Sequence, residues 1–157
     1  MPKFETTRTV AHSPREMFDL VADVERYPEF LPLCRALTVR SRREKGDKTL
    51  LVADMTVAYK MISETFASQV LLRPAEDRID VTYVDGPFRY LDNRWAFEEA
   101  PGGCSVRFFI DYEFKSRTLG LLVGSMFDYA FRRFTTAFEE RADAIYGRGP
   151  GAAAVGA

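Results

Sequence analysis

The sequence has few of the side chains that bind metal ions or act as enzyme nucleophiles. Its 157 residues include a single histidine, His12, and two cysteines, Cys34 and Cys104. The cysteines do not have metal-ligand spacing, and His12 lies beside an expected helix start rather than near either of them. No Ser/His/Asp or Cys/His arrangement is visible. We therefore expect no metal site, no cofactor and no nucleophilic catalysis, and we expect both thiols to be reduced.

Long apolar runs and a strong net charge are also missing. No run approaches the roughly 20 apolar residues that span a bilayer, and residues 1–5 contain no apolar signal region. These absences predict a cytoplasmic protein. The formal net charge of -1 provides no general attraction for DNA. A local basic cluster surrounds a Gly46-Asp47 turn, which is typical of a solvated hairpin tip and leaves a partner-binding patch as the alternative; it contains Arg40, Arg42, Arg43, Lys45 and Lys48.

Aromatic residues, by contrast, are abundant. The chain contains 13 phenylalanines and 7 tyrosines, and 46% of its residues are hydrophobic. A chain of this length buries roughly 70% of its unfolded surface in one core. We therefore expect a single domain over residues 1–146. Residues 147–157 are rich in glycine and alanine, which predicts a disordered tail.

The first part of the chain is predicted to form a strand followed by two short helices. Phe4–Val10 has the pattern of a short strand. Ser13–Glu16 has the sequence of a capping box with proline at the first helical position, so we expect a helix over Pro14–Ala22. Its inward residues are predicted to be Met17, Leu20 and Val21. A second short helix is expected over Val24–Leu31, ended by Pro32.

Turn signals divide residues 34–116 into six predicted strands. These signals are Gly46-Asp47, a weaker break at 60–63, and the segments 74–77, 85–87 and 101–103. Short turns between successive strands imply an antiparallel meander. The last strand, over 105–115, alternates between apolar and polar residues with only Phe109 out of step, and its apolar face consists of Val106, Phe108, Ile110, Tyr112 and Phe114.

The folded chain is predicted to end in one long amphipathic helix, from about Thr118 to Tyr146. At about 1.5 Å per residue it would be on the order of 40 Å long, enough to cross a whole sheet. Its broad apolar stripe is predicted to contain Leu119, Leu122, Val123, Met126, Phe127, Ala130, Phe131, Phe134, Phe138 and Ile145. The expected fold class is therefore α+β, with a curved antiparallel sheet of about seven strands wrapped around this helix.

Several motifs occur in order along the chain. They are YPEFLPLC at 27–34, DGPF at 85–88, Leu91 with Trp95 and Phe97, YEF at 112–114, and AFEERA at 137–142. Together they resemble the coenzyme-Q-binding START-domain family of the polyketide cyclase-like superfamily. The resemblance covers about residues 3–146. The same family includes the bacterial ribosome-association toxin type, which looks similar over these motifs.

The resemblance implies a helix-grip fold of the START/Bet v 1 type with a hydrophobic tunnel. It implies a non-enzymatic carrier or chaperone of ubiquinone, or of a similar isoprenoid lipid, that supports respiratory electron transport. Leu33, where eukaryotic members tend to have an aromatic residue, and the missing transit segment indicate a bacterial member. We expect only transient contact with the inner face of the cytoplasmic membrane, since no anchor or strongly basic amphipathic helix is visible.

The candidate cavity residues come from the apolar faces of the predicted elements. A lipid tunnel needs a continuous apolar lining with a few polar groups near one end. Phe30 and Leu33, in the loop after the second short helix, would form a lid, and the alternative for them is a hydrophobic plug over the sheet edge. The other candidates are Phe66, Val70, Leu72, Tyr90, Trp95, Phe97, Phe108, Ile110, Tyr112, Met126, Phe127, Ala130 and Phe134. The alternative interpretation is that these side chains simply fill one another's space as a core.

A quinone head group would also need polar contacts. Trp95 could stack on the ring, and the candidate hydrogen-bond donors to a carbonyl oxygen are Tyr59, Tyr90, Asn93 and Tyr112. Gly120 and Gly124 weaken the start of the last helix by roughly 1 kcal/mol each. They indicate either a mobile gate or a close contact between helix and sheet.

Two other classes of function stay open at this point. A cyclase-like enzyme would need a titratable group inside the pocket. Asp54 is the candidate, and a solvated, outward side chain is the alternative. A ribosome-association protein would use the basic cluster around Arg42 and Arg43 as phosphate contacts, and its binding would fall steeply with salt.

Overall fold

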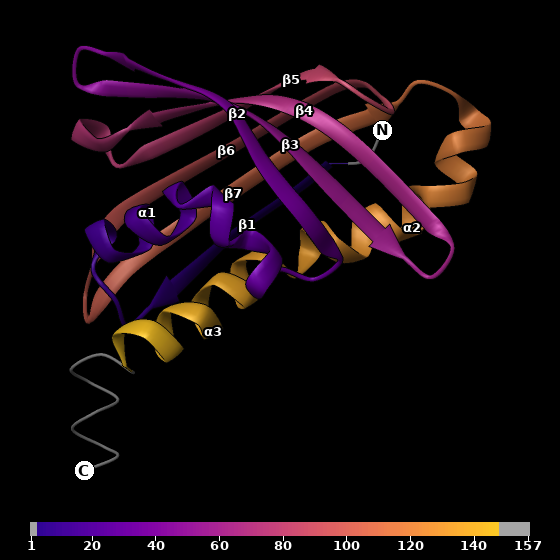
Figure 1. Cartoon of the computed structure of the whole chain (residues 1–157). Helices are drawn as coiled ribbons and strands as arrows, with labels where there is room; N and C mark the ends of the chain where they lie inside the picture. Colours follow the sequence, from indigo (N-terminus) through magenta and orange to yellow (C-terminus); the bar gives the residue numbers. More distant parts are fainter. Residues whose placement is uncertain (1–2, 148–157) are drawn as a thin grey trace.

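The computed structural model describes residues 3–147 and contains a seven-stranded antiparallel sheet with helices packed against one face (Figure 1). In chain order the elements are β1 (Lys3–Val10), α1 (Pro14–Ala22), the 3-10 helix η1 (Val24–Glu29), β2 (Cys34–Lys45), β3 (Lys48–Tyr59), β4 (Ile62–Arg73), the 3-10 turn η2 (Pro74–Glu76), β5 (Arg78–Asp85), β6 (Phe88–Ala100), β7 (Gly103–Phe114), α2 (Arg117–Arg132) and α3 (Phe134–Tyr146). The predicted α+β class and the six-strand meander are confirmed. Apart from Gly147, the predicted disordered tail lies outside the described residues.

The first helix forms as its capping sequence predicts. The Ser13 hydroxyl accepts a hydrogen bond from the Glu16 backbone N–H at 3.0 Å, and the Glu16 carboxylate accepts one from the Ser13 N–H at 2.9 Å. Two donors at the helix start are thereby satisfied, and the predicted inward residues are buried. The second helix differs from the prediction. It is a 3-10 helix that ends at Glu29, and it contains Pro28, which has no N–H to donate.

Irregular pairing bends the sheet around its helices. The strand order is β1-β7-β6-β5-β4-β3-β2, with antiparallel neighbours throughout. Register shifts occur twice between β2 and β3, once between β4 and β5, and once between β6 and β7. Such bulges bend strands. The predicted apolar face of β7 is buried, and Phe109 lies on the other face with the Lys3 and Arg94 cations each 5.4 Å from its ring centre.

The predicted single C-terminal helix is wrong: the chain forms two helices interrupted at Arg133 (Figure 1). The Arg133 N–H donates to the Ala130 carbonyl at 3.2 Å, three residues back, instead of continuing the regular ladder. Phe131 and Phe134 flank the interruption, are both buried, and pack edge to face with ring centres 5.5 Å apart. Both rings pack on the inner face of β7, Phe131 on Tyr112 with ring centres 5.1 Å apart and Phe134 on Phe108 with ring centres 6.0 Å apart.

The buried stripe on these helices is narrower than the sequence predicts. Leu122 and Ile145, both predicted to face inward, are 65% and 50% exposed. Leu122 lies about 100° around the helix from Val123, which is buried. Ile145 belongs to the last turn of α3, beyond the buried Ala142. Within residues 3–147, no helix is both long and apolar enough to cross a membrane.

Candidate functional site

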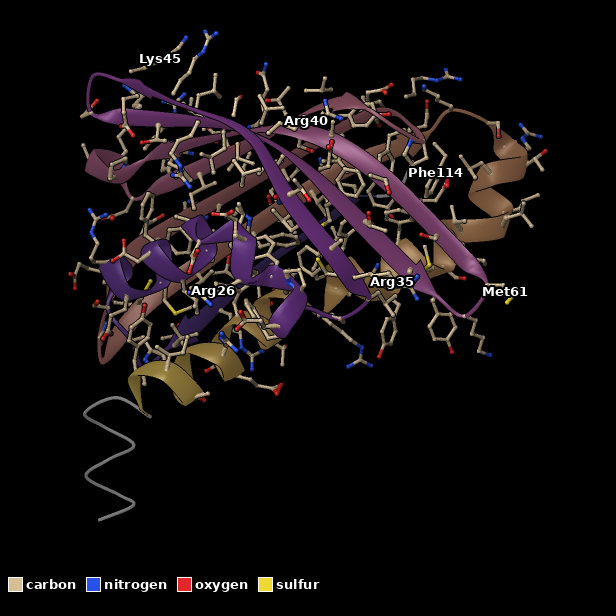
Figure 2. The ribbon with its side chains drawn as sticks, viewed as in Figure 1. Arg26, Arg35, Arg40, Lys45, Met61 and Phe114 are labelled. Carbon is tan, nitrogen blue, oxygen red and sulfur yellow. The ribbon has the colours of Figure 1, made fainter. Side chains whose placement is uncertain are left out.

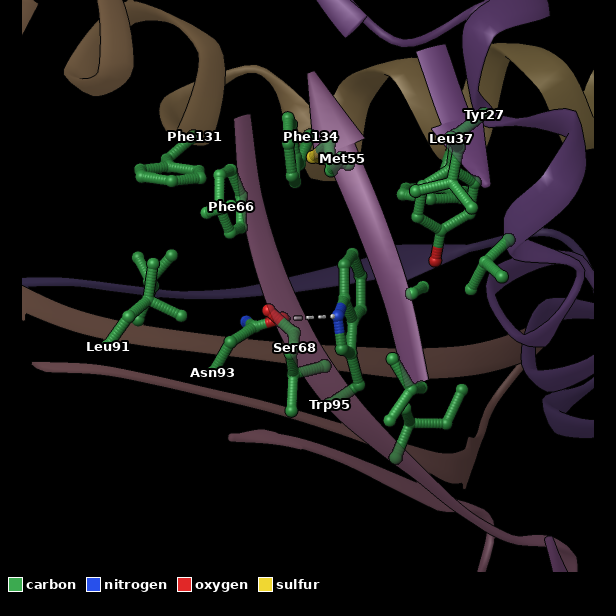
Figure 3. Close-up of a pocket in the computed structure, with 17 residues that line it drawn as sticks. Tyr27, Leu37, Met55, Phe66, Ser68, Leu91, Asn93, Trp95, Phe131 and Phe134 are labelled. Carbon is green, nitrogen blue, oxygen red and sulfur yellow. Dashed lines mark hydrogen bonds between the residues drawn. The ribbon is translucent and has the colours of Figure 1, made fainter. Parts of the chain in front are cut away.

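A cavity of about 70 Å³ lies between the sheet and the two C-terminal helices (Figure 3). Five strands, from β2 to β6, line it together with η1, α2, α3 and one residue of β7. The lining consists of Val24, Tyr27, Leu37, Ala53, Met55, Phe66, Ser68, Val70, Ile79, Val81, Leu91, Asn93, Trp95, Ile110, Phe131, Phe134 and Phe138. This lining is almost entirely apolar, which is the arrangement that a ligand with a large hydrophobic surface needs.

The structure brings part of the predicted candidate set to this cavity. The candidates in the lining are Phe66, Val70, Trp95, Ile110 and Phe134. A second group is buried in the surrounding core outside the lining and comprises Leu72, Phe97, Phe108, Tyr112, Met126, Phe127 and Ala130. These residues support the lining rather than form it: Phe108, for example, packs edge to face on Trp95 with ring centres 4.7 Å apart.

The two predicted lid residues lie beside the helical wall of the cavity. Phe30 is half-buried, and its ring packs edge to face on Phe138 with centres 5.1 Å apart. The Arg141 guanidinium lies 5.0 Å from the centre of the same Phe30 ring. Leu33 adopts a left-handed backbone conformation with φ 64°, and its carbonyl accepts a hydrogen bond from the Ala58 N–H at 2.9 Å. The segment therefore covers α3 and connects it to the sheet.

Tyr27 is a lining residue that the sequence analysis missed. It belongs to η1, where no strand or helix periodicity indicates its direction, and only the YPEF motif marks it. Its hydroxyl donates a hydrogen bond to the Val21 carbonyl, and its ring packs on Phe138 with centres 5.2 Å apart. Burial raises the pKa of Tyr27 well above its usual value. The Tyr27 hydroxyl in the cavity wall is consequently neutral, and its proton is already used in the hydrogen bond to the Val21 carbonyl.

Three of the four predicted head-group donors lie outside the cavity lining. Tyr59 is half-exposed at the end of β3. Tyr90 donates to the Asp111 carboxylate at 3.2 Å on the outer face of the sheet, so its place among the predicted cavity residues is corrected. Tyr112 is buried among aromatic rings, and burial raises its pKa to about 12. Asn93 alone of the four lines the cavity.

Polar side chains in the lining gather on the sheet side. Asn93 donates through Nδ2 to the Phe109 carbonyl at 2.8 Å, and its Oδ1 accepts from the Trp95 indole N–H at 3.2 Å. Ser68, on β4, is buried and lines the same cavity, and its Oγ has no hydrogen-bond partner among the described residues. Ser68 was missed because only apolar residues of this strand were taken as candidates, although alternation with Phe66 and Val70 places it on the same face.

Asp54, the candidate carboxylate for the alternative of a cyclase-like enzyme, does not reach the cavity. Asp54 lies on the outer face of β3, where its carboxylate is 2.6 Å from the Arg40 Nε, while its neighbours Ala53 and Met55 line the cavity. Among the lining residues, Tyr27 is the sole titratable side chain. Within residues 3–147, no group of three or more His, Cys, Asp or Glu side chains is arranged to hold a metal ion.

The structure favours close packing over a gate at the start of α2. A side-chain carbon added at Gly120 would lie 3.4 Å from the Phe114 ring, and one at Gly124 would lie 3.8 Å from it. Both distances are ordinary van der Waals contacts, so the start of α2 packs closely on the end of β7 without requiring glycine at either position. The basic cluster also has a structural explanation in part, because Arg40 pairs with Asp54 and Arg42 lies 3.9 Å from the Glu25 carboxylate.

Comparison with known proteins establishes the family. The family described as polyketide cyclase / dehydrase and lipid transport matches residues 10–139. The chain belongs to this family. Ribosome association toxin RatA from Rickettsia prowazekii is 32% identical over 148 residues, which cover 92% of this chain and 99% of that protein. Coenzyme Q-binding protein COQ10 homolog B, mitochondrial, from Xenopus laevis is 28% identical over 151 residues, covering 93% of this chain and 60% of that protein.

Solved structures agree with this assignment. The solution structure of an 18 kDa protein from Caulobacter crescentus has a TM-score of 0.76 and 30% identity, covering 94% of this chain and 99% of that one. A START superfamily protein from Mycobacterium smegmatis has a TM-score of 0.74 at 22% identity over 91% of this chain and 98% of that one. Zhui aromatase/cyclase from Streptomyces has a TM-score of 0.72 at 17% identity, covering 95% and 99%. The predicted helix-grip fold and family resemblance are confirmed, and the fold also occurs in enzymes.

Proposed function

We propose that this protein binds ubiquinone or a similar isoprenoid lipid between the sheet and helices α2 and α3, and acts as a non-enzymatic carrier or chaperone. The observation that carries the proposal is the cavity lining, which combines aromatic rings and aliphatic side chains with only a few polar groups. An isoprenoid tail matches such a lining through apolar burial, worth roughly 25 cal/mol per Å² removed from water. The name of the COQ10 homolog adds that a relative binds coenzyme Q.

The proposed absence of turnover rests on the chemistry of the lining. General acid or base catalysis needs a titratable group whose pKa lies near the working pH. Tyr27 does not meet this requirement, because its pKa is raised by burial and its hydroxyl is committed to the Val21 carbonyl. Asp54 is on the opposite face of β3. The residues around the cavity therefore suit holding a lipid better than transforming it.

Lipid uptake requires the cavity to widen. Its volume of about 70 Å³ is well below the roughly 300–1,000 Å³ of typical ligand pockets. The interruption at Arg133 separates α2 from α3, and the segment 30–33 contacts α3 through the Phe30 ring, which packs on Phe138 and lies 5.0 Å from the Arg141 guanidinium. We expect α2, α3 and this segment to move apart around the tail while the sheet keeps its shape.

Extraction and mass spectrometry test the proposal. The protein is purified without detergent from a ubiquinone-producing host, and an unrelated protein of similar size serves as the control. We expect near-stoichiometric ubiquinone in the extract and a marked loss from Trp95→Ala, whose side chain contributes a large part of the lining. A clean extract from the unaltered protein, combined with no uptake of added ubiquinone, would rule the proposal out.

We also propose that the end of the molecule bearing the β3–β4 turn contacts the membrane. In this antiparallel sheet, the β3–β4 turn and the β7–α2 connection lie at the same end. Met61 in the turn is 98% exposed and Leu121 on α2 is 82% exposed, with Lys60 and Arg117 as neighbouring cations. Figure 2 shows Met61 at the opposite end from Lys45, which belongs to the basic hairpin. Exposed apolar side chains beside cations suit an anionic lipid surface.

Vesicle flotation tests this contact. The double variant Met61→Asp and Leu121→Asp should lose binding to vesicles containing anionic lipid, whereas Ile145→Asp should retain it. Ile145 is a matched control because it is half-exposed and lies near the C-terminal end of α3. Equal flotation of the double variant and the control would remove the proposed surface.

A second candidate function is ribosome association, favoured by the RatA relative, which aligns over 99% of its own length. The natural phosphate contacts are the exposed Arg42 and Arg43 on β2. Cosedimentation with ribosomal subunits at low and high salt tests it, with a variant carrying glutamate at both positions as the comparison. Binding at low salt that the variant loses would support this function, and absence of binding at low salt would exclude it.

A further inference from the structure

Ser68 places an unsatisfied hydroxyl in the wall of an apolar cavity. The residue is 6% exposed and lies on β4 between two other lining residues, Phe66 and Val70. Its Oγ has no hydrogen-bond partner among residues 3–147. A buried hydroxyl without a partner costs roughly 1–3 kcal/mol. Alanine or valine would avoid this cost, so the position favours a ligand that brings a polar atom.

The neighbouring polar groups show how such an atom would be placed. The Trp95 indole N–H donates a hydrogen bond to the Asn93 amide oxygen, and the Asn93 Nδ2 donates one to the Phe109 carbonyl. These contacts fix the orientation of the amide and the indole. An amide nitrogen has two hydrogens, so Asn93 retains donor capacity beyond the bond to Phe109. In Figure 3, Ser68, Asn93 and Trp95 lie on the sheet side, opposite Phe131 and Phe134 on the helices.

We propose that Ser68 anchors an oxygen atom of the lipid head group, with Asn93 as the second polar contact and Trp95 beside the ring. This inference rests on the proposed lipid-binding function and adds the orientation of the ligand within the site. A serine hydroxyl donates to a carbonyl oxygen and accepts from a hydroxyl group, so both quinone and quinol forms fit. The oxygen-free isoprenoid tail then follows the apolar lining toward the helices. The site thereby selects a lipid with an oxygen-bearing head over a plain isoprenoid hydrocarbon.

Trp95 provides the assay, because it is the single tryptophan of the chain and lines the cavity. Its fluorescence reports binding of a short-tail ubiquinone, and an isoprenoid hydrocarbon without oxygen is measured by competition. Ser68→Ala should weaken ubiquinone binding about 3- to 10-fold, as expected for one lost hydrogen bond, and leave hydrocarbon affinity within about twofold. Val70→Ala is the matched control on the same strand, and it should change both affinities by the same factor.

The stability of the ligand-free variant separates an anchoring role from a structural one. Because the Ser68 hydroxyl has no partner among the described residues, Ser68→Ala should unfold at the same or a higher urea concentration than the unaltered protein. Equal ubiquinone affinity in the two proteins would overturn the inference and leave the proposed function standing. A destabilised variant that loses both probes equally would also overturn it. Failure of the unaltered protein to bind either probe would instead overturn the proposed function, and the inference with it.

Discussion

Replacing Phe138 with alanine tests whether α3 is held to the sheet through the aromatic wall of the cavity. The Phe138 side chain is 1% exposed. Its ring packs edge to face on Tyr27, Phe30 and Trp95, with centre-to-centre distances of 5.2, 5.1 and 5.2 Å. These partners belong to η1, the following loop and β6, so one side chain connects three separate segments to α3.

The expected cost follows from this packing. Truncation of a buried phenylalanine to alanine lowers the free energy of unfolding by roughly 3–5 kcal/mol, and each aromatic pair accounts for about 0.5–1.5 kcal/mol of specific contact. Phe138 also borders an existing cavity, so part of its surface has no neighbour to lose. We therefore expect a loss of about 3 kcal/mol, a large share of the roughly 5–15 kcal/mol typical of a domain.

Urea unfolding monitored by Trp95 fluorescence measures the change. Ile145→Ala, on the same helix but half-exposed, is the control and should cost about 0.5 kcal/mol or less. A loss below 1 kcal/mol for Phe138→Ala, or equal losses for the two variants, would refute the argument that α3 is anchored through this ring.

Three further predictions concern the buried thiols, a buried tyrosine and one turn. Burial raises the pKa of Cys34 and of Cys104 to about 11, so both thiols should react with a thiol reagent at pH 8 only after urea unfolds the protein; rapid reaction in the folded state would contradict this burial. Burial is the chief cause that raises the pKa of Tyr112 from 10.0 to about 12. As the pH rises, this tyrosine therefore ionises in the unfolded chain before it does so in the folded protein. Its contribution to the free energy of unfolding should be constant below about pH 10 and decline from pH 10 to 12. Tyr112→Phe should reduce that alkaline decline in urea titrations, and an unchanged decline would count against the assignment. Gly86→Ala should destabilise the protein by about 2 kcal/mol or more, because Gly86 has φ +146° and an added Cβ would lie 2.6 Å from the Phe66 Cβ; a melting temperature equal to that of the unaltered protein would contradict it.

Elements with strong local signals were predictable from the sequence. The capping box from Ser13 to Glu16 specifies the start of α1 because its hydrogen bonds join residues three apart. The strand at 105–115 was predictable because successive side chains point to opposite faces, so alternation alone identifies the buried side. The turns between the strands follow from glycine, proline and aspartate in short clusters.

Features that depend on distant segments were predicted less well. The interruption at Arg133 has no proline or glycine beside it in the sequence, and the rings of Phe131 and Phe134 next to it pack on β7, a strand distant in the chain. Tyr90 was placed in the cavity by its aromatic character, although the β6 register turns it toward Asp111 on the outer face. A bulge between Phe88 and Tyr90 shifts the alternation there, and pattern reading does not locate such a bulge.

The sequence by itself determined that this chain forms an α+β domain with one apolar sheet face and an amphipathic C-terminal segment, because periodicity and capping act between near neighbours. Only the tertiary structure decided which of many buried aromatic residues border a cavity and which are ordinary core. It also placed Ser68 in the lining and Asp54 on the opposite side of the sheet. Those assignments depend on sheet curvature and helix docking, which arise from contacts between segments far apart in the chain.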